Sequence, residues 1–282
     1  MKSVRTRSPR WTGPFLRWIG LGVYTLWVIF PLYWLIRTSL VPSVDANSLP
    51  PDWFSHLGIS SYQAVFSSGA FLTALLHSLI VSACVTAVAV LCGTFAGFGL
   101  THLRRNVRVT GNYEFWVLSS RMAPPIAVAL PLYFIYVKIH LEDTLLGLII
   151  AQTATVVGII SWIMIETFRS IPAEVLEAAE ADGCSSWRAF RTIGWPLARP
   201  GAVGAATIAF LLSWNEFFLA LVLTNTAART GPVALYQFIG YESLNLGQLA
   251  AASCVILIPT VIVVGLFQRQ LVSGLTFGAV KG

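Results

Sequence analysis

The sequence contains six apolar runs that are each long enough to cross a lipid bilayer as a helix. The hydrocarbon core of a bilayer is about 30 Å thick, which requires about 20 helical residues. The runs are Trp18–Ile36, Leu75–Leu100, Phe115–Val137, Leu145–Ile165, Val203–Leu223 and Leu249–Phe267. A backbone inside a membrane must satisfy its own hydrogen bonds, and these runs are continuous rather than short and alternating, so helices are expected. We therefore predict an all-α membrane protein with six transmembrane helices.

The charged residues fit this interpretation. Only 11% of the 282 residues are charged, whereas a soluble domain is usually about a quarter charged. The net charge of +6 does not indicate nucleic acid, because the basic residues cluster at the ends of apolar runs. Most of them lie in residues 1–17, after the second and fourth runs, and in residues 269–282. The positive-inside rule therefore places both termini in the cytoplasm, as tails of one six-helix domain, residues 18–268.

Several kinds of chemistry lack their usual motifs. The sequence has no GxxxxGK[ST] phosphate-binding loop, no HExxH and no GxSxG. Its cysteines and histidines, four of each, show no metal-ligand or disulfide spacing. We therefore expect a non-catalytic chain with no metal and no cofactor of its own.

Two of the runs carry polar residues. The third contains Arg121 and three prolines, so we expect it to be bent or broken. The fifth contains Trp214, Asn215 and Glu216, and an ionisable group in a span must be paired or face water. Two interpretations stay open: Glu216 lines a translocation path and accepts hydrogen bonds from solute hydroxyls, or it pairs structurally with Arg121 or a partner subunit. In the second run, Gly93 and Gly97 form a small-residue packing pattern.

The charged loop at residues 170–200 predicts two short helices joined by a turn. Ser170 can cap the first helix, and Gly183 permits a turn that a Cβ would strain. Ser185 or Ser186 can cap the second helix, with Pro196 ending it. Three glutamates should share a face of the first helix, and three apolar residues should form a stripe on the second. These are Glu174, Glu177 and Glu180, then Trp187, Phe190 and Ile193. Without further information the loop would be an ordinary amphipathic connector.

The spacing within this loop is more specific than that. Glu177-Ala178-Ala179, then Gly183, Ile193 and Pro196, resembles the EAA coupling loop of the membrane subunits of ABC importers. The residue at 195 departs from the family, which more often has leucine where this chain has tryptophan. The resemblance implies that a cytoplasmic ATPase docks on Glu177, Ala178, Ala179, Asp182, Gly183, Trp187, Ile193 and Pro196.

Three further segments resemble the carbohydrate-importing branch of the same family. The C-terminal tail is similar to that of the second membrane subunit of maltose-type transporters, which implies that it reaches the ATPase dimer through Gly274, Leu275, Thr276, Gly278 and Lys281. Residues 213–218 resemble the WNEF segment of the family, and residues 121–127 resemble sugar and polyol importers. The candidate path residues are thus Trp214, Asn215, Glu216 and Arg121.

The resemblance implies a multi-pass permease of the bacterial cytoplasmic membrane that forms half of a path for a sugar or polyol. Its implied partners are a second membrane permease subunit, a P-loop ATPase dimer that holds ATP and Mg²⁺, an extracytoplasmic solute-binding protein and the lipid bilayer. We expect the external segment 224–248 to meet the binding protein. The alternatives are an ion-driven secondary transporter and a membrane scaffold without transport activity.

Overall fold

The computed structural model describes residues 14–48, 56–67, 69–103, 124–239 and 245–276, with residues 112, 113, 115 and 119. Within this described part the chain is helical and has no β-strand. The longer helices are α1 (Pro14–Leu40), α3 (Ser60–Ser67), α4 (Ala70–Phe98), α6 (Pro125–Lys138), α7 (Leu145–Arg169), α8 (Ala173–Ala181), α10 (Trp195–Trp214) and α13 (Leu246–Thr276). The shorter ones are α2 (Ser43–Ala46), α9 (Ser186–Ala189), α11 (Phe218–Leu223), α12 (Gly231–Ala234) and the π- and 3₁₀-segments Gly99–Leu103, Phe190–Gly194 and Leu235–Phe238.

Five helical stretches in the described part are long and apolar enough to cross a membrane. They are Arg17–Leu40, Ala70–His102, Leu145–Arg169, Ser186–Trp214 and Leu246–Gln270. The third predicted run is represented by α6, which begins at Pro125 and has 14 residues. At 1.5 Å per residue it is about 21 Å long, which is shorter than the bilayer core. The described residues therefore provide five candidate spans and one shorter apolar helix.

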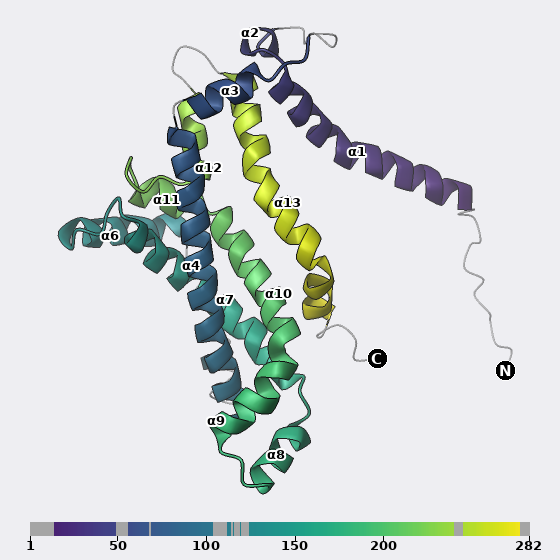
Figure 1. The fold of residues 1–282 in the computed structure, drawn as a ribbon, viewed down its shortest axis with the longest axis vertical. Helices are drawn as coiled ribbons and strands as arrows, with labels where there is room; N and C mark the ends of the chain where they lie inside the picture. Colours follow the sequence, from purple (N-terminus) through teal and green to yellow (C-terminus); the bar gives the residue numbers. More distant parts are fainter. Residues whose placement is uncertain are drawn as a thin grey trace, which may run out of the picture. The chain divides into compact units, whose positions relative to one another are not determined.

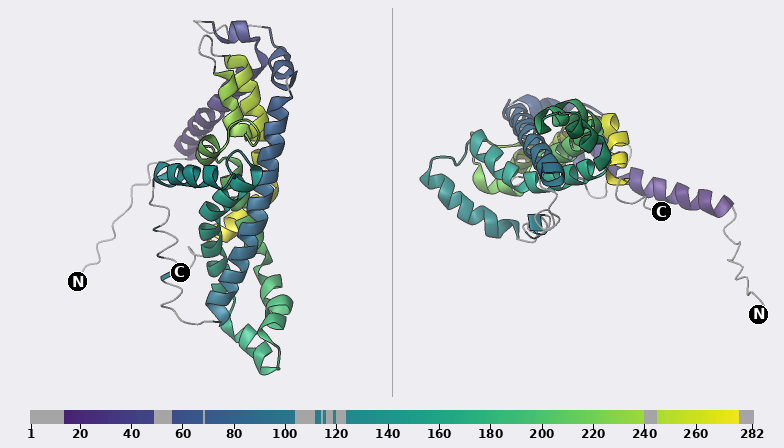
Figure 2. Two further views of the ribbon diagram at one scale, coloured as in Figure 1. Left: turned by 90° about the vertical axis from the view of Figure 1, so that its left-hand side faces the viewer. Right: turned by 90° about the horizontal axis from the view of Figure 1, so that it is seen from below.

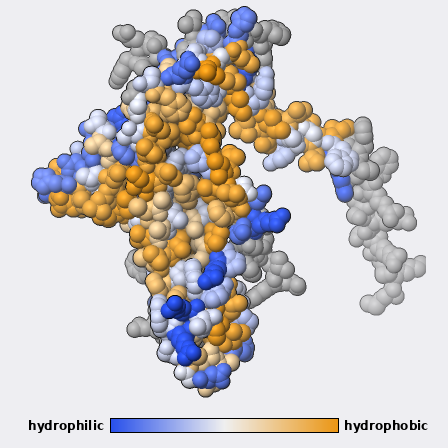
Figure 3. Space-filling model, viewed as in Figure 1, coloured by the Kyte–Doolittle hydropathy of each residue, from blue (hydrophilic) through white to orange (hydrophobic). Residues whose placement is uncertain are grey.

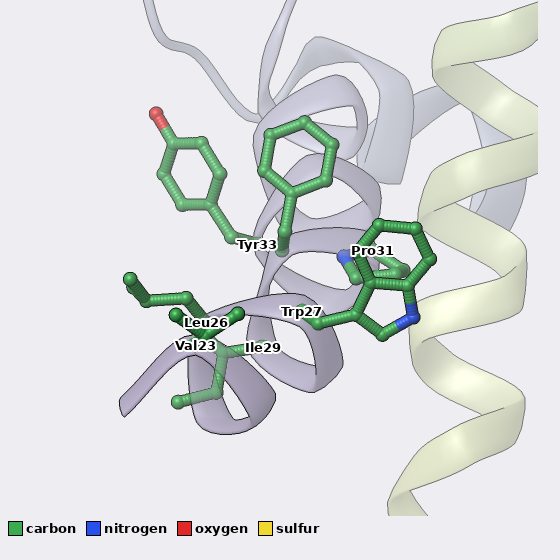
Figure 4. A pocket seen from close by; sticks show the side chains of 7 residues that line it. Val23, Leu26, Trp27, Ile29, Pro31 and Tyr33 are labelled. Atoms are coloured by element: carbon green, nitrogen blue, oxygen red, sulfur yellow. The ribbon is translucent and has the colours of Figure 1, made fainter. Parts of the chain in front are cut away.

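The chain divides into two compact units. The first comprises residues 1–67 and 238–255, and the second comprises residues 68–237 and 256–282. In the first unit, α1 is apolar on all sides, and none of the side chains in its most apolar window is buried. Figure 4 shows a hollow on this helix that is lined by Val23, Leu26, Trp27, Ile29, Phe30, Pro31 and Tyr33. Such a helix needs lipid or other apolar helices around it.

The core of the second unit is formed where α4, α7 and α10 pack along one another (Figures 1 and 2). Glycines allow the close approach. A Cβ at Gly97 would lie 2.8 Å from the backbone carbonyl of Met164, and one at Gly201 would lie 2.4 Å from the Thr167 side chain. Hydrophobic residues cover much of the surface of these helices, whereas hydrophilic residues gather around α8 and α9 (Figure 3). The prediction that the glycine pattern in the second run serves packing is confirmed.

A smaller apolar cluster holds α6 and α11. Ala129 and Tyr136 of α6 are buried with Ala151 of α7 and with Leu219 and Leu223 of α11. In the figures α6 runs across the direction of α4 rather than along it (Figures 1 and 2). The helix α11 thus packs against both α6 and α7.

Three local predictions are wrong. Pro196 does not end the second loop helix, because α9, a π-helical turn and α10 form one continuous helical stretch, and Pro196 lies in the first turn of α10, where its missing N–H costs little. Ser170 does not cap α8; it ends α7, and Pro172 precedes α8 instead. The fifth run is not one helix, because α10 ends at Trp214 and α11 begins only at Phe218.

Candidate functional site

The turn after α8 is fixed by a glycine in the left-handed region. Gly183 has a φ of +82°. Its N–H donates to the carbonyl of Glu180 at 3.0 Å, and the N–H of Cys184 donates to the carbonyl of Ala179 at 3.0 Å. These two bonds make a Schellman motif, which satisfies the last carbonyls of the helix. The predicted glycine turn therefore has a defined geometry rather than a loose one.

The second arm of the loop begins at a capped helix. Ser185 Oγ accepts a hydrogen bond from the N–H of Arg188 at 3.4 Å, so the predicted serine cap is present. The helix then continues without interruption to Trp214, a stretch of 29 residues. At 1.5 Å per residue this stretch is about 43 Å long. The loop therefore leads directly into the longest described part of the fifth run.

An aromatic cluster anchors this arm to the core helices. Phe190 is buried and lies with its ring centroid 5.0 Å from that of Phe98 on α4. Trp187 stacks on Phe190 at 5.3 Å, yet 60% of its surface remains exposed. Ile193 packs against the same core. Phe190 and Ile193 of the predicted apolar stripe thus pack against the core, whereas the ring of Trp187 remains largely exposed.

The exposed face of α8 is acidic. Leu176 and Ala179 are buried against the core. The residues on the outer side, all exposed, are Glu174, Glu177, Ala178, Glu180 and Asp182. Arg188 and Arg191 are also exposed on the second arm. The loop therefore combines a rigid apolar base with a charged outer surface.

The break in the fifth run separates the candidate path residues. Trp214 is 2% exposed, and its Nε1 donates to the carbonyl of Ile256 on α13 at 3.1 Å. Asn215 is exposed, although its Nδ2 donates back to the carbonyl of Leu211 at 2.8 Å. Of these two residues, only Asn215 has a side chain that a solute can reach in this conformation.

The Glu216 carboxylate is held within the chain. Its two oxygens accept hydrogen bonds from the backbone N–H groups of Leu219 at 2.7 Å and Ala220 at 3.0 Å. Gln152 of α7 donates to the same carboxylate at 3.3 Å. These bonds cap α11 and replace hydration of a charged group. Of the two interpretations of Glu216, the structure offers partners for structural pairing. These partners are the side-chain amide of Gln152 and two backbone N–H groups.

Several predicted residues lie outside the described part of the chain. Arg121, Gly278 and Lys281 are among them, so their predicted contacts are not described by the structure. Gly274, Leu275 and Thr276 form the end of α13. In the described part no group of three or more His, Cys, Asp or Glu residues is arranged to hold a metal ion.

A contact between Asp143 and the segment after α11, which we call the Asp143 strap, was not anticipated from the sequence. Asp143 lies between α6 and α7, and its carboxylate accepts hydrogen bonds from four consecutive backbone N–H groups, those of Asn225, Thr226, Ala227 and Ala228, at 2.8–3.1 Å. Burial opposes ionisation, but the four donors outweigh it and lower the pKa of Asp143 below its ordinary value. The strap ties the segment after α11 to the connection between α6 and α7. No local motif signals it, because the donors are more than eighty positions away.

Further contacts hold the segment after α11 on α4. Ser78 Oγ accepts a hydrogen bond from the N–H of Gly231 at 2.8 Å. The Nδ1 of His77 lies 3.1 Å from the carbonyl oxygen of Arg229. His77, to which the sequence assigned no role, therefore contributes to a structural contact.

Comparison with known proteins decides the family. The profile of the family described as "Binding-protein-dependent transport system inner membrane component" matches residues 89–276, about two thirds of the chain. This chain belongs to that family. It is accordingly an integral, multi-pass protein of the inner membrane and a component of a transport system. The match includes the loop at 170–200, the break at Asn215 and all of α13.

Individual relatives of this inner membrane component extend the match over nearly the whole chain. SugB, a permease protein of a trehalose transport system from Mycobacterium tuberculosis, is 34% identical over 264 residues, which is 91% of this chain and 93% of the relative. MalG, a permease protein of a trehalose/maltose transport system from Thermococcus litoralis, is 30% identical over 268 residues, 94% of this chain and 95% of the relative.

A solved structure shares the fold. In the crystal structure of a bacterial ABC transporter involved in the import of the acidic polysaccharide alginate, one chain matches with a TM-score of 0.74 over 95% of this chain and 99% of that chain. The sequence identity is 19%. The architecture of this inner membrane component is therefore that of an ABC transporter subunit.

Proposed function

We propose that this chain is one of two membrane permease subunits of a sugar-importing ABC transporter. It would cross the membrane six times with both termini in the cytoplasm, and it would form half of the translocation path. The second permease subunit, a cytoplasmic ATPase dimer and an extracytoplasmic solute-binding protein would complete the complex. ATP and Mg²⁺ would bind to the ATPase. The names of the relatives, which concern trehalose and maltose transport, support a sugar as the solute.

The observation that carries this proposal is the construction of the loop at 170–200. The Schellman turn at Gly183 fixes the two arms, and the aromatic cluster around Phe190 anchors them to α4 and α7. The exposed acidic face of α8 and the open ring of Trp187 are the surfaces that a docked ATPase would contact. Aromatic rings with an exposed face are favoured at protein interfaces.

The continuous helix from Ser186 to Trp214 supports the coupling mechanism. When ATP closes the ATPase dimer, the docked loop would move with it. Because the second arm of the loop and α10 are parts of one helix, this movement would pass into the membrane domain and open the path outward. Hydrolysis would then reset the complex. Asn215, exposed at the end of α10, is the residue of this chain that we assign to the path lining.

Uptake by the reconstituted complex tests the proposal. Proteoliposomes that contain this chain, its partner permease and the ATPase are supplied with the solute-binding protein outside and ATP inside. We expect uptake of a radiolabelled disaccharide that requires ATP and stops when the phosphate-binding lysine of the ATPase is replaced. Glu177→Lys should reduce uptake and ATPase binding, whereas Glu166→Gln, outside the loop, serves as the matched control.

The alternative functions predict different results. Uptake driven by an ion gradient without ATP would identify a secondary transporter. Assembly with cytoplasmic partners without any solute uptake would identify a scaffold. Either result would refute the proposed function.

A further inference from the structure

One buried side chain spans the break in the fifth run. Gln152 of α7 is 1% exposed. Its Oε1 accepts a hydrogen bond from Ser213 Oγ at 2.5 Å, and its Nε2 donates to Glu216 at 3.3 Å. Ser213 lies in the last turn of α10, and Glu216 lies beyond it. The structure therefore gives both ends of a buried amide a partner, one on each side of the break. We call these three residues the Gln152 clasp.

The segment before the break is the end of the continuous helix that begins at Ser186. This end is held by the hydrogen bond from Trp214 to the carbonyl of Ile256. The ring of Phe210 stacks on Trp214 at 5.7 Å. A displacement of the second arm of the loop would therefore also move this end, because both belong to one helix.

The segment after the break is held against α6 and α7. At its start, Glu216 caps α11 by accepting from the N–H groups of Leu219 and Ala220. At its end, the Asp143 strap holds the four N–H groups of residues 225–228. Between these two carboxylates, α11 packs on α6 and α7. The short helix α11 is thus held at its start, by packing on α6 and α7, and after its end.

The break itself is the place where the fifth run can bend. Asn215 has backbone angles outside the regular helix, with φ −90° and ψ 4°, and Phe217 lies in the helical region with a φ of −116°. The backbone ladder of α10 ends there, and one further backbone bond, from the N–H of Glu216 to the carbonyl of Ser213 at 3.2 Å, lies at the break. Bending at this point therefore leaves the interior bonds of α10 and α11 intact. Small changes at such element ends are what hinge motions use.

We infer that Gln152 is a positioning residue for transport: it aligns the two sides of the break so that movement of α10 reaches α11 and, through α11, the helices α6 and α7. This inference rests on the proposed transport function. Gln152 acts through Ser213 and Glu216, not on the solute, because it is buried and both ends of its amide are engaged within the chain. Its loss should therefore lower the rate of transport without changing the affinity for the sugar.

Three variants in the reconstituted complex test this. Gln152→Met keeps the volume of the side chain and removes both bonds. Gln152→Glu places a second carboxylate beside Glu216, and like charges at this distance repel. Ser213→Ala removes the other bond of the clasp and leaves the bonds of Glu216 to Leu219 and Ala220 in place. Ser161→Ala is the matched control, because Ser161 is equally buried on α7 but bonds within its own helix.

The expected result is a separation of kcat from KM. One hydrogen bond to a charged group shifts an equilibrium by roughly tenfold, so the maximal uptake rate of Gln152→Met should fall about tenfold with the KM for sugar unchanged. More ATP should be hydrolysed per sugar. Gln152→Glu should be worse, Ser213→Ala should also lower the maximal rate with the KM unchanged, and Ser161→Ala should resemble the wild type.

Other outcomes overturn the inference. A raised KM with an unchanged maximal rate would make Gln152 a solute contact. Wild-type rates in Gln152→Met or in Ser213→Ala would show that the clasp does not position the helices. If the wild-type complex itself takes up no sugar, the proposed function fails, and this is recognised before any variant is measured.

Discussion

Replacing Gly97 by alanine tests the closest approach between α4 and α7. The added Cβ would lie 2.8 Å from the carbonyl carbon and oxygen of Met164, whereas carbon atoms in good contact are about 3.5–4.0 Å apart. Because the neighbouring atoms are backbone, no side-chain rotation relieves the clash, and the two helices must separate by roughly 1 Å. Overpacking of this kind costs about 1–3 kcal/mol.

Gly99→Ala supplies the matched control. A Cβ at Gly99 meets nothing within 4 Å, and its backbone is helical with φ −61° and ψ −42°. Both variants gain a similar intrinsic preference for helix, so this contribution cancels when they are compared. The difference in the free energy of unfolding between them should therefore be about 1–3 kcal/mol, with Gly97→Ala the less stable.

Thermal unfolding of the two purified variants in detergent measures this difference. At about 2–4 °C per kcal/mol for a domain of this size, Gly97→Ala should unfold roughly 2–12 °C below Gly99→Ala. Equal unfolding temperatures would show that α4 and α7 do not approach each other as closely as described. The assignment of the glycine pattern to helix packing would then be wrong.

Three further predictions concern the loops and the tail. Gly183→Val forces a left-handed backbone at a cost of about 1–2 kcal/mol, so it should weaken ATPase binding in a pull-down titration about tenfold, more than Gly183→Asn does; equal affinities would refute the strain argument. Because the pKa of Asp143 is lowered on folding, the strap stabilises the protein fully above the ordinary value of 3.8 and is lost as the pH falls through the lower folded value. The loss of thermal stability caused by Asp143→Ala should therefore shrink in acid, and a loss that does not change with pH would contradict this cause. Deleting the residues after Gly274 should lower the sugar transported per ATP hydrolysed while membrane insertion stays normal, and undiminished transport would reject a role for the tail.

Local features of the loop could be predicted from the sequence. A glycine between two helical patterns indicates a left-handed turn, because glycine adopts a positive φ without a steric penalty and this preference depends on that residue alone. Gly183 and the cap at Ser185 are of this kind. The apolar runs also predicted the long helices, since their lengths follow from the bilayer.

Features that depend on distant contacts were missed or misread. A proline predicts a helix end only if its position in the turn is known, and Pro196 occupies a first turn, where it is tolerated. The burial of Trp214 against α13 could not be predicted, because a run that is apolar on every side does not indicate which side is buried; its assignment to the path stays a prediction. The contacts of Gln152 could not be predicted, because its partners are more than sixty residues away in the sequence.

The measurement that tests the central claim most directly is co-purification of the tagged chain from its native membrane, with the co-eluting proteins identified after crosslinking. A membrane subunit of an ABC importer should recover a P-loop ATPase and a second multi-span permease. The same purification from Glu177→Lys should lose the ATPase and keep the second permease. Recovery of the chain alone, from a preparation in which crosslinking proves that complexes are intact, would contradict the account.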